Sequence, residues 1–157
     1  MIWGAIAQDQ KFTLVQMTPF PCKQPKGSKS IDGKKYAEKV INGPLAQACR
    51  DMAEATGKEI LVVEDGASPH RSKAAKDARA AQGIKSLVHP AHSPDLNPIE
   101  TIWRLLKRGL AKRPVIPSDQ EELWTAIQEV WEEILVAQIN QQIVQIIRKV
   151  HGWYTRF

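Results

Sequence analysis

The hydrophobic residues at the start of the chain fall into two short β-prone runs. Residues 1–7 and 11–17 are rich in aliphatic and aromatic side chains, and the polar residues 8–10 separate them. This pattern predicts a β-hairpin. The next segment, residues 18–31, contains three prolines and several lysines and serines, so we expect a surface loop there.

Apolar side chains then recur with helical spacing from about Asp32 to Thr56. Gly57 is expected to end this helix, because glycine readily adopts the left-handed conformation found at helix ends. The sequence Asn42-Gly43-Pro44 is expected to kink it, because proline removes a helical hydrogen bond. The predicted apolar face comprises Tyr36, Val40, Leu45, Cys49 and Met52.

The middle of the chain predicts a strand, a helix and a second strand. Residues 59–65 include four consecutive aliphatic residues without alternation, which indicates a strand covered on both faces at the centre of an α/β sheet. A helix is predicted over 68–82, with Ser68 as its cap and Gly83 as its stop, and a strand over 84–88. The three elements together predict a parallel β-α-β unit.

The last third of the chain is predicted to be helical. Asn97 as N-cap, Pro98 at the first helical position and Glu100 three residues after the cap begin a helix that runs to about Lys112. Ser118 and Glu121 repeat the capping pattern. The helices that follow are expected to present apolar faces of Leu123, Ile127, Val130 and Ile134, and then of Ile139, Ile143, Ile146 and Val150.

Composition limits the classes of protein that fit. We expect a domain over residues 1–115 with a helical extension, residues 116–157, packed on it. A net charge of +5 and a pI near 9.3 suit a polyanionic partner. Cys22 and Cys49 have no paired spacing and are expected to be free thiols. Without a signal peptide or long apolar run, we expect a soluble, intracellular protein that is not secreted and has no membrane partner.

Two acidic residues, Asp65 and Glu100, lie at positions where a carboxylate can bind a ligand or a metal ion. Asp65 ends a predicted parallel strand, and the carboxyl ends of such strands are where ligands bind in α/β sheets. Glu100 lies in the first turn of a helix, where the helix dipole favours the ionised form. Thirty-four residues separate them, enough for the chain to return to the same edge. One or two carboxylates with waters and phosphate oxygens are the usual ligands of Mg²⁺.

Two sequence blocks surround these carboxylates. Glu64-Asp-Gly-Ala-Ser-Pro-His70 resembles the block around the second catalytic Asp of mariner and pogo-type transposases. His92-Ser-Pro-Asp-Leu-Asn-Pro-Ile-Glu100, followed by Trp103 and Leu106-Lys107-Arg108, resembles the block around their third acidic residue. The spacing between the blocks is one found in that family, and residues 1–6 resemble the Trp-Gly strand that precedes them. The likeness covers most of the chain.

The resemblance implies an RNase H-like mixed sheet flanked by helices, in which three carboxylates hold two Mg²⁺ or Mn²⁺ ions. Asp65 and Glu100 match the second and third carboxylates as catalytic residues and metal ligands. The family's first Asp lies on a strand upstream of the Trp-Gly strand, outside residues 1–157, and Asp9 in the hairpin turn does not replace it. We therefore expect an α/β domain without its first strand, and a two-metal site only in the complete domain.

The missing strand has a structural consequence. In this fold the first strand lies between the second and the fourth, so its absence would separate the hairpin from the strand that ends at Asp65 and expose unpaired edges. The family's helix-turn-helix region is also outside the chain. We expect either a truncated product or a gene model begun at an internal methionine.

Several nearby residues have competing interpretations. Glu100 taken alone could merely complete a helix cap, and Asp65 could be a turn former. His70, Asp95 and Asn97 are expected to support the site. A zinc cluster of His70, His89 and His92 is disfavoured because no close paired spacing or cysteine accompanies them.

A basic face follows Glu100 along its helix, opposite an apolar face of Ile99, Ile102, Leu106 and Leu110. It comprises Arg104, Lys107, Arg108 and Lys112, and either faces solvent or neutralises DNA phosphates. Trp124 and Trp131 are expected in a core or interface rather than stacked on bases.

The resemblance implies metal-dependent cleavage and strand transfer of DNA, with transposon ends and target as partners, no small-molecule substrate and a nuclear location. With two of three carboxylates, weak or no activity is expected from this chain. The alternatives are a non-catalytic nucleic-acid-binding or assembly module and a product without function. A homodimer is left open.

Overall fold

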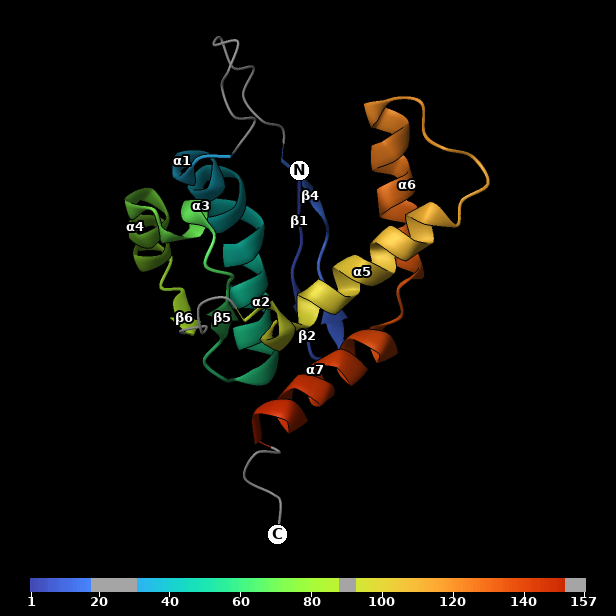
Figure 1. The fold of residues 1–157 in the computed structure, drawn as a ribbon. Coiled ribbons are helices and arrows are strands. Elements are labelled where there is room, and N and C mark those ends of the chain that lie inside the picture. Colours follow the sequence, from blue (N-terminus) through green and yellow to red (C-terminus); the bar gives the residue numbers. More distant parts are fainter. Residues whose placement is uncertain (18–30, 88–92, 152–157) are drawn as a thin grey trace. The chain divides into compact units, whose positions relative to one another are not determined.

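The computed structural model describes residues 1–17, 31–87 and 93–151. The chain forms two compact units. Figure 1 shows the helices and strands that make them up. The first contains Met1–Gly4 and Val15–His92, and the second contains Ala5–Leu14 and Ser93–Phe157. The hairpin is thus divided between them, while the domain boundary expected after residue 115 remains a prediction.

The first seventeen residues form the predicted antiparallel hairpin in two short ladders. Strand β1 (Ile2–Trp3) pairs with β4 (Val15–Gln16) in the first unit. Strand β2 (Ile6–Ala7) pairs with β3 (Gln10–Lys11) in the second unit. Asp9, in the turn between β2 and β3, has a φ of +63°, a left-handed conformation that aspartate tolerates better than most residues.

The long helix predicted from Asp32 is confirmed, together with its kink. It consists of α1 (Gly33–Tyr36), the segment η1 (Ala37–Leu45), in which two helical parts meet at the kink, and α2 (Ala46–Thr56). Inside η1, Gly43 has φ −125° and ψ −109°, directly before Pro44. Proline disfavours helical geometry in the residue before it, which accounts for the kink. Gly57 ends α2 with φ +64°.

The middle of the chain forms the predicted parallel unit, but its helix is broken. Strand β5 (Leu61–Val63) pairs in parallel with β6 (Lys85–Leu87). The helical part between them divides into α3 (Ser68–Arg71) and α4 (Lys73–Ala81), because Ser72 has an extended ψ of 154°.

Side-chain chemistry at the break explains why the single helix predicted over 68–82 was wrong. The Ser72 side chain accepts a hydrogen bond from the backbone N–H of Ala75 and so caps α4, competing with helix continuation. Ser68 is the first residue of α3 rather than its cap, which is Ala67. Gly33 permits the close approach at the break, since a Cβ there would lie 1.9 Å from Ser72 Oγ.

The prediction that the aliphatic strand is covered on both faces was also wrong. Leu61 and Val63 are 52% and 40% exposed, and only Val62 between them packs against the core. Within the described residues, β5 hydrogen-bonds to β6 alone, and β1 with β4 forms a separate sheet. A run of aliphatic residues indicates that a strand is hydrophobic, but it does not show which other elements cover the strand. The β1–β4 sheet and the β5–β6 sheet are separate, as the sequence predicted for a sheet without its first strand.

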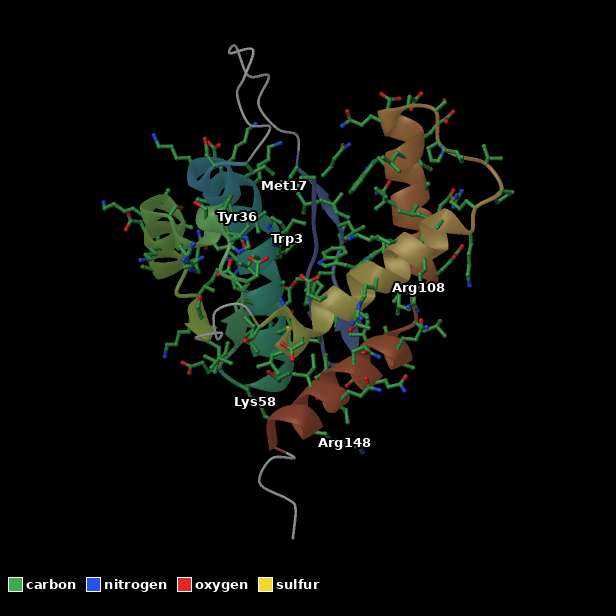
Figure 2. All side chains as sticks on the ribbon, viewed as in Figure 1. Trp3, Met17, Tyr36, Lys58, Arg108 and Arg148 are labelled. Atoms are coloured by element: carbon green, nitrogen blue, oxygen red, sulfur yellow. The ribbon has the colours of Figure 1, made fainter. Side chains whose placement is uncertain are left out.

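The core of the first unit lies along the kinked helix. Val40 and Ile41 are fully buried, and α4 packs against η1. Trp3 on β1 packs against the same core, which Figure 2 shows with Met17 and Tyr36 labelled nearby. The buried members of this core are Met17, Ile31, Tyr36, Ala37, Val40, Ile41, Leu45, Ala46, Ala75 and Ile84.

The second unit is mainly helical. Its helices are α5 (Pro98–Ala111), α6 (Gln120–Glu133) and α7 (Val136–His151), preceded by the 3-10 turn η2 (Pro94–Leu96). Helix α5 contacts both α6 and α7. The buried side chains are Ile102, Leu106, Ala126, Val130, Trp131, Ile134 and Ile139.

Helices α5 and α6 approach closely at one glycine. A Cβ added at Gly109 would lie only 2.4 Å from Cγ1 of Val130. Nearby, Trp103 stacks on Trp131, with ring centroids 5.7 Å apart. Trp131 is 2% exposed, which confirms its expected place in the core.

Helix α6 begins one residue later than its predicted cap. Asp119, not Ser118, is the N-cap, and its carboxylate accepts hydrogen bonds from the N–H groups of Glu121 and Glu122. Aspartate is as good an N-cap as serine, and its charge also complements the helix dipole. Leu123 is 42% exposed, so its predicted place on the apolar face was wrong.

The tip of the hairpin is fixed to the helices of the second unit. The Lys11 ammonium donates to the carbonyl oxygens of Trp131, Glu132 and Ile134 at 2.8, 2.8 and 3.2 Å, which satisfies the end of α6. Asp9 and Asn140 exchange two hydrogen bonds, both 2.7 Å long. Asp9 therefore has a local structural role.

Candidate functional site

Asp65 lies two residues beyond the end of β5, and its side chain is 54% exposed. Its Oδ1 accepts a hydrogen bond from the N–H of Ala67 at 3.1 Å and lies 2.7 Å from Nδ1 of His70. Both contacts involve the same oxygen. The carboxylate is therefore held in one orientation while remaining accessible to solvent, as a ligand for a hard cation must be.

His70 occupies α3 beside Asp65. Its Nδ1 also lies 3.1 Å from the backbone oxygen of Asp65. Because both neighbours of Nδ1 can only accept, this nitrogen carries the proton in the arrangement described. The imidazole packs against the ring of Tyr36, with centroids 4.3 Å apart. The placement agrees with a supporting residue, although that function remains a prediction.

A charged network that sequence reasoning missed lies behind Asp65. The phenol of Tyr36 donates to Oε1 of Glu64 at 2.5 Å, and Arg79 Nη1 donates to Oε2 of Glu64 at 2.8 Å. Arg79 Nη2 donates to the backbone oxygen of His70 at 2.7 Å. The Glu64 and Arg79 side chains are each only 12% exposed. The signal in the sequence was a glutamate directly after a run of aliphatic residues, but its partner lies fifteen positions away.

The network changes the ionisation of its tyrosine. Burial raises the pKa of Tyr36 well above its ordinary value, and the negative charge of Glu64 raises it further. Tyr36 therefore stays neutral and remains a donor to Glu64 at any physiological pH.

Glu100 lies in the first turn of α5 and is half-buried. Asn97, which is 9% exposed, caps the helix as predicted: its Oδ1 accepts from the N–H of Ile99 at 3.3 Å. The backbone N–H of Glu100 donates to the carbonyl of Asn97 at 3.1 Å. Asp95 lies in η2 and is exposed. Asn97 thus fixes the start of the helix that carries Glu100.

The basic face of α5 is exposed, as the sequence predicted. Arg104, Lys107, Arg108 and Lys112 all face solvent, while Ile102 and Leu106 are buried on the other side. A hollow of about 330 Å³ lies in this unit, with Thr101, Arg104 and Arg108 of α5 and Gln142 and Gln145 of α7 in its lining. Figure 2 labels Arg108 on α5 and Arg148 on α7.

Asp65 belongs to the first unit and Glu100 to the second. Within residues 1–17, 31–87 and 93–151, no group of three or more His, Cys, Asp or Glu side chains could hold a metal ion. His89 and His92, considered above for zinc, lie outside the described residues.

Comparison with known proteins identifies the fold. The catalytic domain of the Mos1 mariner transposase matches with a TM-score of 0.72 at 17% identity, over 92% of this chain and 67% of that one. The structure of the Mos1 mariner paired end complex with Mn matches with the same TM-score, over 94% of this chain and 40% of that one. The described fold is accordingly an RNase H-like α/β fold with a helical C-terminal part.

The model of the DDE superfamily endonuclease family matches residues 30–123, more than half of the chain. The chain belongs to this family, as a transposase domain of the mariner and Tc1 type. The Tc3 transposase of Caenorhabditis elegans is 26% identical over 155 residues, and the Tcb2 transposase of Caenorhabditis briggsae is 31% identical over 102 residues. They align with 94% and 64% of this chain.

The chain spans 43% and 37% of the lengths of these two relatives. In the described residues, no helix is long and apolar enough to cross a membrane.

Proposed function

We propose that this chain forms part of a transposase domain that cleaves and joins phosphodiester bonds with the help of divalent metal ions. Asp65 and Glu100 are the proposed metal ligands. The observation that carries the proposal is the Asp65 carboxylate: it is exposed at the end of a parallel strand and held through one oxygen by His70 and Ala67. The matched family model spans both carboxylates.

The residues present suit Mg²⁺ or Mn²⁺, because both metals favour carboxylate oxygens. When bound, such ions stabilise the attacking and leaving oxygens of an in-line displacement at phosphorus. His70 would orient Asp65, and Asn97 would fix the start of the helix that bears Glu100. Both are positioning roles, as is the supporting role proposed for Asp95.

Residues 1–157 carry two of the three carboxylates implied by the family, so we propose that they cleave DNA weakly or not at all without the third. The test is Mn²⁺ binding together with nicking of supercoiled DNA; Asp65→Asn and Glu100→Gln should each bind Mn²⁺ more weakly and lose any metal-dependent nicking. Asp77→Asn is the matched control, because Asp77 is an exposed aspartate that pairs with the exposed Lys73 one helical turn away. Nicking that persists in both site variants would refute the assignment.

We also propose that the exposed basic side chains of α5 contact the DNA backbone. Arg104, Lys107, Arg108 and Lys112 point to solvent along one helix, which suits phosphate neutralisation without base reading. A non-catalytic DNA-binding module would share this surface. The two functions differ in their response to metal. A non-catalytic module should bind DNA equally well after Asp65→Asn and Glu100→Gln, show no metal-dependent nicking, and lose no Mn²⁺ binding in either variant.

The biological setting follows from the family rather than from the geometry. We propose transposon ends and target DNA as partners, a nuclear location, and a homodimer as the assembly to be tested.

A further inference from the structure

We propose that Arg79 is a positioning residue for Asp65, acting through the two ends of the segment that carries it. This inference rests on the proposed function, because it assumes that the Asp65 carboxylate binds a metal ion. The segment runs from Glu64 to His70, with Asp65 at its second position. Arg79 contacts both of its ends.

Arg79 bridges the two ends of this segment through two hydrogen bonds. One guanidinium nitrogen of Arg79 donates to the Glu64 carboxylate at 2.8 Å, and the other donates to the His70 carbonyl oxygen at 2.7 Å. A guanidinium presents its donors in a rigid, planar fork, so the two acceptors are held at a fixed separation. The backbone between them is thereby closed into a loop of defined width.

Asp65 is linked to both residues that Arg79 contacts, Glu64 and His70. It follows Glu64 directly in the chain, and its Oδ1 contacts the ring of His70. The other side of the network is fixed by Tyr36, which bonds to Glu64 and packs on the His70 ring. The direction of the exposed Asp65 carboxylate therefore depends on Arg79, although the two residues have no direct contact among those described.

Stability alone is a poor explanation for such a pair. Taking two charges out of water costs free energy that their attraction often fails to recover, and apolar replacements of similar volume are frequently neutral or stabilising. A role in aiming a ligand is a better explanation, because small displacements of a metal ligand weaken binding strongly.

The test measures Mn²⁺ affinity and thermal unfolding together in the whole chain. Arg79→Lys keeps the positive charge beside Glu64 but cannot bridge Glu64 and the His70 carbonyl. We expect it to unfold near the wild-type temperature while binding Mn²⁺ about tenfold or more weakly. Arg71→Lys, at an exposed position of α3, is the matched control and should leave both quantities unchanged.

A second variant guards against loss of folding. The triple variant Tyr36→Phe, Glu64→Leu, Arg79→Met removes the buried polar groups together, so none is left without a partner. It should fold and show the same weakened Mn²⁺ affinity. Wild-type affinity in folded Arg79→Lys and in the triple variant would overturn the inference. Equal Mn²⁺ binding by wild type and Asp65→Asn would instead overturn the proposed function.

Discussion

The hydroxyl of Tyr36 donates a hydrogen bond to the Glu64 carboxylate, joining the first helix of the chain to the residue before Asp65. Arg79 donates to the same carboxylate, and the His70 ring packs against the Tyr36 ring. Burial and the Glu64 charge together raise its pKa. Because the bond needs a neutral phenol, the network has a defined dependence on pH.

The first prediction concerns alkaline pH. The unfolded chain loses the Tyr36 proton above about pH 10, whereas the folded chain keeps it, so unfolding releases a proton there. The contribution of Tyr36 to stability is therefore complete below about pH 10 and decreases as the pH rises beyond it. Thermal unfolding of wild type should lose stability more steeply in that range than Tyr36→Phe. Parallel curves would contradict the assignment.

At neutral pH, Tyr36→Phe removes one of the donors to Glu64. Hydrogen bonds to charged groups typically contribute about 1.5–3 kcal/mol, so the free energy of unfolding should fall by about that amount. Urea unfolding measures it. A change below a few tenths of a kcal/mol would mean that the bond is replaced by water.

Lys11→Met tests the attachment of the hairpin tip to the end of α6. Methionine keeps the apolar stem but leaves three carbonyl groups at the end of α6 without their ammonium donor. Loss of a partly buried cation at a helix C-terminus should cost about 1–2 kcal/mol of unfolding free energy. Lys58→Met, at an exposed position, is the control and should change it little. Equal effects of the two substitutions would contradict the role of Lys11.

Gly109→Ala tests the close approach of α5 and α6. A methyl group there would meet Val130, whose short branched side chain cannot move aside without shifting the helix. Overpacking should cost about 1–3 kcal/mol, more than alanine gains in helix propensity. The double variant Gly109→Ala, Val130→Ala provides room for the new methyl. If Gly109→Ala alone is stabilising, the two helices are farther apart than described.

Local signals in the sequence predicted much of the fold. The kink before Pro44, the stop at Gly57 and the Asn97 cap depend on residues within a few positions of each other, and all three are confirmed. The break at Ser72 was missed because serine can either sit in a helix or cap the next one. The exposure of Leu61 was missed because coverage of a strand depends on other strands.

In the candidate site, too, short-range features could be predicted from the sequence and long-range contacts could not. Asp65 and His70 could be located from a short block, and the structure places them in contact. The contribution of Arg79 could not be inferred, since its pairing with Glu64 requires α4 to pack against the kinked helix. Nothing in the sequence alone fixes that packing.

The central claim is that Asp65 and Glu100 are ligands of divalent metal ions. The most direct measurement is paramagnetic broadening of backbone amide signals by small amounts of Mn²⁺. We predict selective broadening at Ala67, near Asp65, that is lost in Asp65→Asn, and at Thr101, near Glu100, that is lost in Glu100→Gln. Broadening at neither position, or no greater than at the exposed pair Glu121 and Glu122, would contradict the claim.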